Sequence, residues 1–179
     1  MVQIIELFGN KSLVKTLVFF LRNPSLQIHQ QGLRKKIKIA KATSIWVMGF
    51  LVKNNLLKET SFGRTRIYSL NRENPLVKQI KLMDNLALLS EIKKILLDYD
   101  LRIYVYGSVA RGEDVENSDV DILIVGKLKK SDIIQKINKI SENMGKKIKI
   151  EVFSQLEWAQ MAKKDPAFYE RVEKDKIEL

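Results

Sequence analysis

The spacing of apolar residues in the first part of the chain predicts helices followed by a hairpin. Three stretches carry apolar residues at helical spacing: residues 11–21, 28–37 and 43–52. Thr43 or Ser44 could cap the third helix, because either side chain can accept hydrogen bonds from the free amides of its first turn. Leu56-Leu57 then opens a strand, residues 61–64 suit a turn, and residues 65–70 return with alternating side chains, which together is typical of a β-hairpin.

The second part of the chain mixes helical and strand patterns. Helical spacing occurs at 76–89, 90–99 and 131–144, and strand patterns occur at 103–106, 119–124 and 147–153. Pro75 and Ser131 suit helix starts, Gly145 suits a helix end, and Ser154 with Glu157 forms a capping-box pattern. We therefore expect an α+β chain in three parts: residues 1–74, linker helices at 75–99 and residues 100–179.

Two carboxylates stand one residue apart where the second of these strand patterns begins. Because side chains on a strand alternate between faces, Asp119 and Asp121 are expected on the same face, opposite Val120 and Ile122. Two like charges held so close are unfavourable unless a cation lies between them. Mg²⁺ suits such a pair, because it takes few protein oxygens and completes its coordination with phosphate and water.

A Gly-Ser pair follows the first of these strand patterns. Glycine at 107 lets the backbone approach an anion closely, and Ser108 offers a hydroxyl. If a helix begins at Ser108, its free amides also favour negative charge. The turn and the two carboxylates together predict a site for a metal ion and a phosphate group.

These residues resemble the signature of the DNA polymerase β nucleotidyltransferase superfamily. Gly107-Ser108 is followed, after ten residues, by Asp119-x-Asp121, and the Gly-Ser-x-Ala-Arg-Gly run is similar to the minimal nucleotidyltransferase branch. The resemblance implies a small α/β core with a mixed sheet, which transfers a nucleoside monophosphate from an NTP, with ATP as the favoured donor. It implies Mg²⁺ or Mn²⁺ on Asp119 and Asp121, and a triphosphate held by Gly107, Ser108 and Arg111.

The strand pattern at 147–153 adds a third carboxylate. Its alternation places Lys149, Glu151 and Phe153 on one face, so Glu151 is expected beside Asp119 and Asp121. The superfamily carries a third carboxylate on this strand, which implies a catalytic and metal-binding role for Glu151. Most minimal members have Asp here, so Glu151 departs from the pattern, and a surface glutamate on an edge strand is the alternative.

The role of Arg111 and the identity of the acceptor complete the expected reaction. Arg111 could stabilise charge on the phosphates, or it could form a structural ion pair with Glu113 or Asp114. The part from residue 101 onward covers little more than the minimal core of the family. The resemblance therefore implies a small-molecule or protein acceptor, including the small helical toxin-like proteins with which minimal nucleotidyltransferases are often paired.

Charge separates the first part of the chain from the rest. The net charge is +11, and residues 1–75 contain 13 Lys and Arg against 3 Asp and Glu. Residues 101–179 contain 15 against 14. A basic module attached to a neutral one indicates a polyanion-binding unit beside a unit with another task.

The basic part resembles winged helix-turn-helix modules, especially in the runs Leu-Val-Lys-Asn-Asn-Leu-Leu-Lys-Glu and Gly-Arg-Thr-Arg-Ile-Tyr. The turn before its third helix lacks the glycine often found there. The resemblance implies double-stranded DNA as the partner, with contacts from these residues of the third helix and the wing: Lys41, Thr43, Ser44, Trp46, Arg64 and Arg66. Trp46 could equally be a core residue, and a solvated basic face or a protein-binding module is the alternative for the whole unit.

Other features limit the remaining function classes. The chain has no cysteine, which excludes disulfides and thiolate metal sites and agrees with a cytoplasmic protein. No apolar run approaches the length that crosses a bilayer. The broad apolar surface at 76–89 could pack within the chain or against a second copy in a homodimer. The rival to the enzyme is a DNA-binding regulator whose nucleotidyltransferase-like part senses nucleotide without catalysis.

Overall fold

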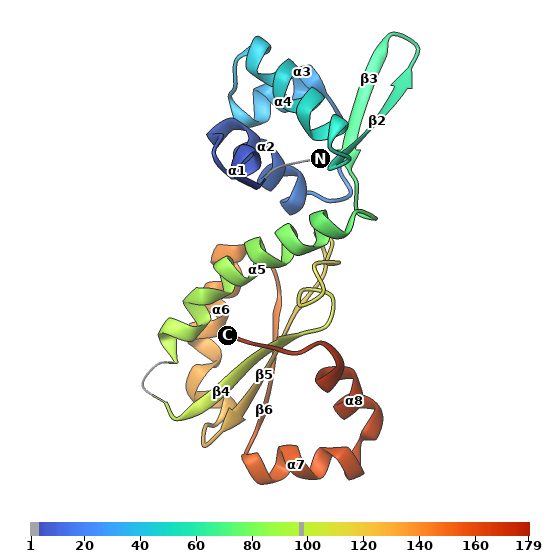
Figure 1. The fold of residues 1–179 in the computed structure, drawn as a ribbon. Coiled ribbons are helices and arrows are strands. Elements are labelled where there is room, and N and C mark those ends of the chain that lie inside the picture. Colours follow the sequence, from blue (N-terminus) through green and yellow to red (C-terminus); the bar gives the residue numbers. More distant parts are fainter. Residues whose placement is uncertain (1–3, 97–98) are drawn as a thin grey trace. The chain divides into compact units, whose positions relative to one another are not determined.

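The protein forms two compact units, Met1–Lys81 and Leu82–Leu179. The structure is a computed structural model that describes residues 4–96 and 99–179 (Figure 1). Among the helices in these ranges, none is both long and apolar enough to cross a membrane.

The first unit packs helices against a small antiparallel sheet. Its elements before the boundary helix are α1 Ile4–Phe8, α2 Lys11–Arg22, β1 Ile28–His29, α3 Gln30–Ile37, α4 Lys41–Lys53, β2 Leu57–Phe62 and β3 Thr65–Leu70. The predicted helices and hairpin are confirmed as α2, α3, α4 and β2–β3, and the sheet has the order β1-β3-β2. Two residues are too few to show an alternating pattern, so β1 was not predicted. The core gathers the buried side chains of Leu17, Phe20, Leu33 and Leu51.

Two helices begin earlier than their expected caps. Helix α4 starts at Lys41, so Ser44 falls on its buried face. There its hydroxyl donates to Lys41 O at 2.8 Å and accepts from Gln30 Nε2 at 2.9 Å. Helix α6 likewise starts one residue before Ser131. In both cases the capping prediction was wrong, because the backbone enters the helix before the polar side chain is reached.

Helix α5, Pro75–Ile95, is continuous where the sequence predicts two helices. Ser90 was expected to begin the second, but its hydroxyl donates to Ala87 O at 2.8 Å within the same helix. The helix contributes Val77 to the core of the first unit and Leu89 to the core of the second. Residues 97–98 of the predicted second helix lie outside the described residues.

The second unit is built on a mixed sheet, as the family resemblance implies. Its elements are β4 Leu101–Tyr106, β5 Val120–Gly126, α6 Lys130–Met144, β6 Ile148–Phe153, α7 Gln155–Lys164, α8 Pro166–Asp175 and β7 Ile177–Glu178. The sheet order is β6-β5-β4-β7, in which β5 and β6 are parallel and the other pairs are antiparallel. The short edge strand β7 was not predicted. The capping box of Ser154 and Glu157 and the helix end at Gly145 are both confirmed.

The two faces of this sheet carry different layers (Figure 1). Ile103, Val105 and Ile122 lie on the face packed against α6 and the second half of α5. Tyr104, Tyr106 and Leu123 lie on the other face, against α7 and α8. Because strand residues alternate between faces and Tyr106 pairs with Asp121, the carboxylate of Asp121 belongs to the second face. The α7–α8 layer therefore borders the candidate site.

Candidate active site

The candidate site lies where β4 ends and β5 begins. Tyr106, the last residue of β4, pairs with Asp121 in the antiparallel ladder, which places Gly107 against the carboxylate. Gly107 has a φ of +75°, and a Cβ added there would lie 2.9 Å from Asp121 Oδ2. Position 107 therefore requires glycine for both its backbone conformation and its close approach to Asp121.

The segment from 107 to 112 is a series of turns, and the helix expected at Ser108 is absent from this described segment. Arg111 N donates to Gly107 O at 3.2 Å, and Glu113 N donates to Ser108 O at 2.9 Å. These bonds fold the segment over itself after the glycine reverses its direction. Ser108 is only partly buried, so its hydroxyl lies at the edge of the site.

A buried polar cluster fastens the end of this segment, and sequence reasoning missed it. Asp114 is 1% exposed and accepts a hydrogen bond from Asn85 Nδ2 at 2.8 Å. The same amide also donates to Val109 O at 3.1 Å, and Lys146 forms an ion pair with Asp114. The sequence indicated only Arg111 as a partner for Asp114. Nothing local indicates its contacts with Asn85 on α5 and with Lys146, the second residue after α6. The cluster holds the turn that carries Gly107 and Ser108.

Asp119 directly precedes β5, and its nearest charged partner comes from the neighbouring strand. Lys149 on β6 is the ladder partner of Asp121, and its Nζ lies 2.6 Å from Asp119 Oδ2. The hydrogen bond from Lys149 lowers the pKa of Asp119, and the same contact raises the pKa of Lys149. An ammonium group thus occupies a position beside the two carboxylates where a cation is favoured.

Asp121 is less exposed to water than its partner. Burial raises its pKa, and the nearby charges of Asp119 and Asp175 raise it further, while Lys149 lowers it. The pKa of the Tyr106 phenol next to Asp121 is also raised, to about 12, by burial and by the negative charges of Asp121 and Glu151. Burial is the main cause of both shifts, and a cation close to Asp121 would favour its charged form.

The predicted third carboxylate shares the face of Asp121 but is exposed. Glu151 is the ladder partner of Leu123 on β5, so it points to the α7–α8 side of the sheet. Within residues 4–96 and 99–179, no group of three or more His, Cys, Asp or Glu side chains lies close enough to hold a metal ion. Asp119 and Asp121 suit a cation, but in this structure Glu151 does not complete a three-carboxylate group with them.

Arg111 is engaged by two carboxylates. Its Nε lies 3.0 Å from Glu113 Oε2, and its Nη1 contacts Asp175 at the end of α8. Of the two ion-pair partners weighed from the sequence, the structure shows Glu113 and not Asp114. Asp175 also accepts a hydrogen bond from Gly107 N at 3.2 Å. The sequence gave no signal for Asp175, because only the return of the chain from α8 to β7 brings it to this turn.

The predicted DNA-contact residues are mostly exposed. Trp46 is 50% exposed, which decides against a core role, and Lys41 and Arg64 are exposed as well. Thr43 is partly buried. Arg66 lies on the hairpin with its Nε 3.6 Å from Glu59 Oε1. Ser44 is the exception, because its hydroxyl is fully buried and bonded within the helices.

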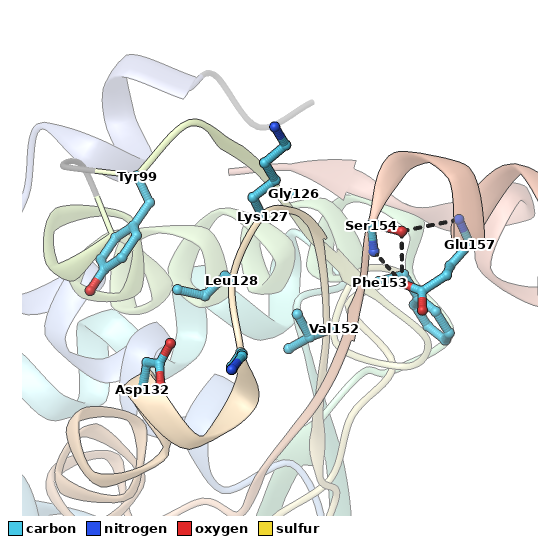
Figure 2. A pocket seen from close by; sticks show the side chains of 10 residues that line it. Tyr99, Gly126, Lys127, Leu128, Asp132, Val152, Phe153, Ser154 and Glu157 are labelled. Carbon is cyan, nitrogen blue, oxygen red and sulfur yellow. Dashed lines mark hydrogen bonds between the residues drawn. The ribbon is translucent and has the colours of Figure 1, made fainter.

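A hollow of about 570 Å³ lies at the other end of β5 from the two carboxylates (Figure 2). It is lined by Tyr99, the loop 126–129, Asp132, and the region of Val152 to Glu157. Ser154 and Glu157 are already bonded to each other there in the capping box (Figure 2). At about 3.3 Å per strand residue, the hollow is about 16 Å from Asp121, so it is a separate feature.

Comparison with known proteins identifies a family for the second part of the chain. Residues 88–178 match the nucleotidyltransferase domain family. No curated protein matches the sequence. One solved structure, a protein of Sulfolobus solfataricus assigned only provisionally as a nucleotidyltransferase, is 22% identical, with 58% of this chain and 84% of that chain covered and a TM-score of 0.32. The family match spans just over half of the chain, and the chain therefore belongs to the nucleotidyltransferase domain family.

Proposed function

We propose that this chain transfers a nucleoside monophosphate from an NTP, with ATP as the favoured donor, to a hydroxyl of an acceptor. The observation that carries the proposal is the contact of the Gly107 turn with Asp121, next to Asp119. A backbone that must be glycine borders a half-buried carboxylate pair, which is the arrangement needed to bring a phosphate chain against a metal ion.

Each residue of the site has a proposed task. Asp119 and Asp121 would hold Mg²⁺ or Mn²⁺, with Glu151 as a further ligand if its exposed side chain turns toward them. The Gly107 amide, the Ser108 hydroxyl and the Arg111 guanidinium would bind phosphate oxygens. A bound metal supplies positive charge to the triphosphate and lowers the pKa of the attacking hydroxyl. In the reaction the acceptor hydroxyl gives its proton to water as its oxygen bonds to the α-phosphorus. The bond between the α-phosphorus and the oxygen that bridges it to the β-phosphate breaks, and pyrophosphate leaves with that oxygen.

The acceptor follows from family resemblance and from the size of the unit. The second unit contains little besides the sheet and its covering helices, so a large acceptor must bring its own structure. We propose a protein side chain on a small helical toxin-like partner, with small-molecule hydroxyls as the second choice.

The test is transfer of label from α-³²P-labelled ATP, with each of the other NTPs in parallel, in the presence of Mg²⁺ and candidate acceptors. Transfer should fall by at least about 100-fold in Asp119→Asn and Asp121→Asn, because each removes charge that the reaction requires. The matched control is Glu170→Ala, which removes an exposed carboxylate on α8. The proposal is contradicted if all acceptors stay unlabelled, or if the Asp119→Asn and Asp121→Asn variants transfer label as well as the wild type.

A nucleotide sensor without catalysis is the second candidate. It is favoured by Lys149, whose ammonium already pairs with Asp119, and by the exposed position of Glu151. A sensor would bind ATP without releasing pyrophosphate in the presence of any acceptor, whereas an enzyme would release pyrophosphate when the acceptor is present. Equilibrium binding of ATP together with pyrophosphate release separates the two.

We further propose that the first unit is a winged helix-turn-helix module that binds double-stranded DNA in the cytoplasm, as a monomer or a homodimer. Support comes from the exposed face of α4, where Lys41, Ile45 and Trp46 point outward, and from the β2–β3 hairpin with its exposed Arg64. The excess of basic residues in this part of the chain supplies the charge for phosphate contacts. The apolar Ile45 and Trp46 suit thymine methyl groups or sugar edges.

A further inference from the structure

The side chain of Asp175 lies on two of the groups that we propose for phosphate binding. Its Oδ1 accepts a hydrogen bond from Gly107 N at 3.2 Å, and its Oδ2 contacts Arg111 Nη1. A carboxylate and a phosphate use the same donors, because both offer anionic oxygens to N–H groups. A backbone amide has a single proton to donate, so Gly107 cannot serve Asp175 and a phosphate oxygen together.

Asp175 reaches this turn because the chain crosses the sheet edge after α8. Helix α8 ends at Asp175, and β7 then pairs with β4 through Ile177 and Glu178. Leu179 N donates to Ile103 O at 2.9 Å, which extends the pairing by one bond. The segment 175–179 is thus held to β4, the strand that leads directly into Gly107.

The segment 175–179 is held by the ion pair, by a short strand pairing and by partial burial of Ile177 and Leu179. In the ion pair the side chain of Arg111 is 43% exposed and that of Asp175 is 10% exposed, so the guanidinium is open to water while the carboxylate is mostly covered. The β7 pairing involves only two residues of each strand. Short edge pairings of this kind open locally without unfolding the rest of a domain.

The charge of Asp175 also acts on the carboxylate pair. Its negative charge is among those that raise the pKa of Asp121. In its observed position it would repel a triphosphate arriving at the same turn. Arg111 keeps a second partner in Glu113, so the guanidinium stays beside the turn when Asp175 leaves it.

We propose that Asp175 is a carboxylate latch on the Gly107 turn, which sets the affinity of the site for polyphosphates by competing with them for Gly107 N and Arg111. Binding of a polyphosphate releases the segment 175–179 from β4. This inference rests on the proposed nucleotide site, but it concerns binding and not transfer.

The experiment is calorimetric titration of inorganic tripolyphosphate and of ATP, each with Mg²⁺, into the full chain. Asp175→Ala should bind both probes about 5–10-fold more tightly than the wild type, because the binding-competent turn is then always available. Asp175→Asn keeps an acceptor oxygen but loses the charge, so its affinities for both probes should lie between those of the wild type and of Asp175→Ala. Glu170→Ala on the same helix removes an equal charge without touching the turn, and its affinities should equal those of the wild type.

Hydrogen exchange gives a second readout on the same samples. In the wild type, tripolyphosphate should speed exchange of the amides in 177–179, and in Asp175→Ala these amides should exchange fast without ligand. Equal or weaker binding by Asp175→Ala overturns the latch, as does binding with no change in exchange. Tight binding by Asp175→Ala with no transfer to any acceptor supports the latch and counts against the proposed transferase.

Discussion

Lys149 Nζ lies 2.6 Å from Asp119 Oδ2, so the strand next to the carboxylate pair supplies a positive charge of its own. Lys149 is also the ladder partner of Asp121, which fixes its position beside both carboxylates. Its side chain is 52% exposed, so the ammonium can exchange this contact for water. The lysine therefore stabilises the pair when no metal is bound and competes with a metal for Asp119.

Replacing Lys149 should strengthen metal binding. In Lys149→Met the carboxylates lose their internal cation, and we expect Mn²⁺ to bind up to about fivefold more tightly, a small effect because the ion pair is exposed to water. Electron paramagnetic resonance of free Mn²⁺ measures the affinity. Lys136→Met, on the exposed side of α6, is the control. Weaker Mn²⁺ binding in Lys149→Met would contradict the competition.

Substituting Gly107 should damage the site more than the fold. In Gly107→Ala the added Cβ would lie 2.9 Å from Asp121 Oδ2, and the positive φ of 75° adds strain of about 1 kcal/mol. We expect a small loss in the free energy of unfolding but a large loss of ATP binding, since Asp121 and the turn must separate. Gly63→Ala is a matched control, because Gly63 also has a positive φ but an open surrounding. Equal ATP affinity in both variants would contradict the prediction.

Removing Asp114 should destabilise the second unit. Asp114 is buried and paired with Lys146, and Asp114→Ala leaves that ammonium and the Asn85 amide without their partner. Breaking such a pair costs about 3 kcal/mol. Urea denaturation checks this, with Glu142→Ala on exposed α6 surface expected to be neutral. If Asp114→Ala changes the free energy of unfolding as little as Glu142→Ala does, the buried cluster does not stabilise the turn.

DNA binding should depend on the hairpin and on α4 in different ways. Arg64→Ala should weaken binding to any duplex and reduce the slope of log affinity against log salt by about 1. Trp46→Ala should weaken binding with little effect on the salt slope, since Trp46 is apolar and half exposed. Ser44→Ala should instead lower stability, because its hydroxyl bonds Gln30 inside the unit. Fluorescence anisotropy at several salt concentrations gives the slopes, and an absence of duplex binding by the wild type would reject the module.

The capping box of α7 predicts a pH dependence of stability. Hydrogen bonds from the backbone and side chain of Ser154 lower the pKa of Glu157 below its ordinary value of 4.5. The unfolded chain then binds the proton more readily, so this stabilisation is present above pH 4.5 and is lost as the pH falls through the lowered pKa. Ser154→Ala should cost about 1 kcal/mol near neutral pH. Thermal denaturation should show this difference shrinking in acid, and a constant difference would contradict the assignment.

Local patterns were enough to locate the signature residues. The strand, turn and strand predicted around Gly107 are present as β4, the turns after it and β5, and the ladder pairs Tyr106 with Asp121. The caps at Gly145 and Ser154 were also predicted, because each depends on residues within one helical turn. The helix starts expected near Ser44 and at Ser90 were wrong. Both serines lie inside a helix, and where a helix begins depends on which of its faces is buried, which the local sequence does not show.

The sequence by itself determined the Gly107 turn, the spacing of Asp119 and Asp121 and the separation of charge along the chain, since each is a property of neighbouring residues. Only the tertiary structure decided which charges meet there. Lys149 arrives through parallel pairing of β6 with β5, and Asp175 arrives through the return of the chain along β4. Such contacts join residues far apart in the sequence, and their positions are set by the packing of whole strands and helices, which no local pattern records.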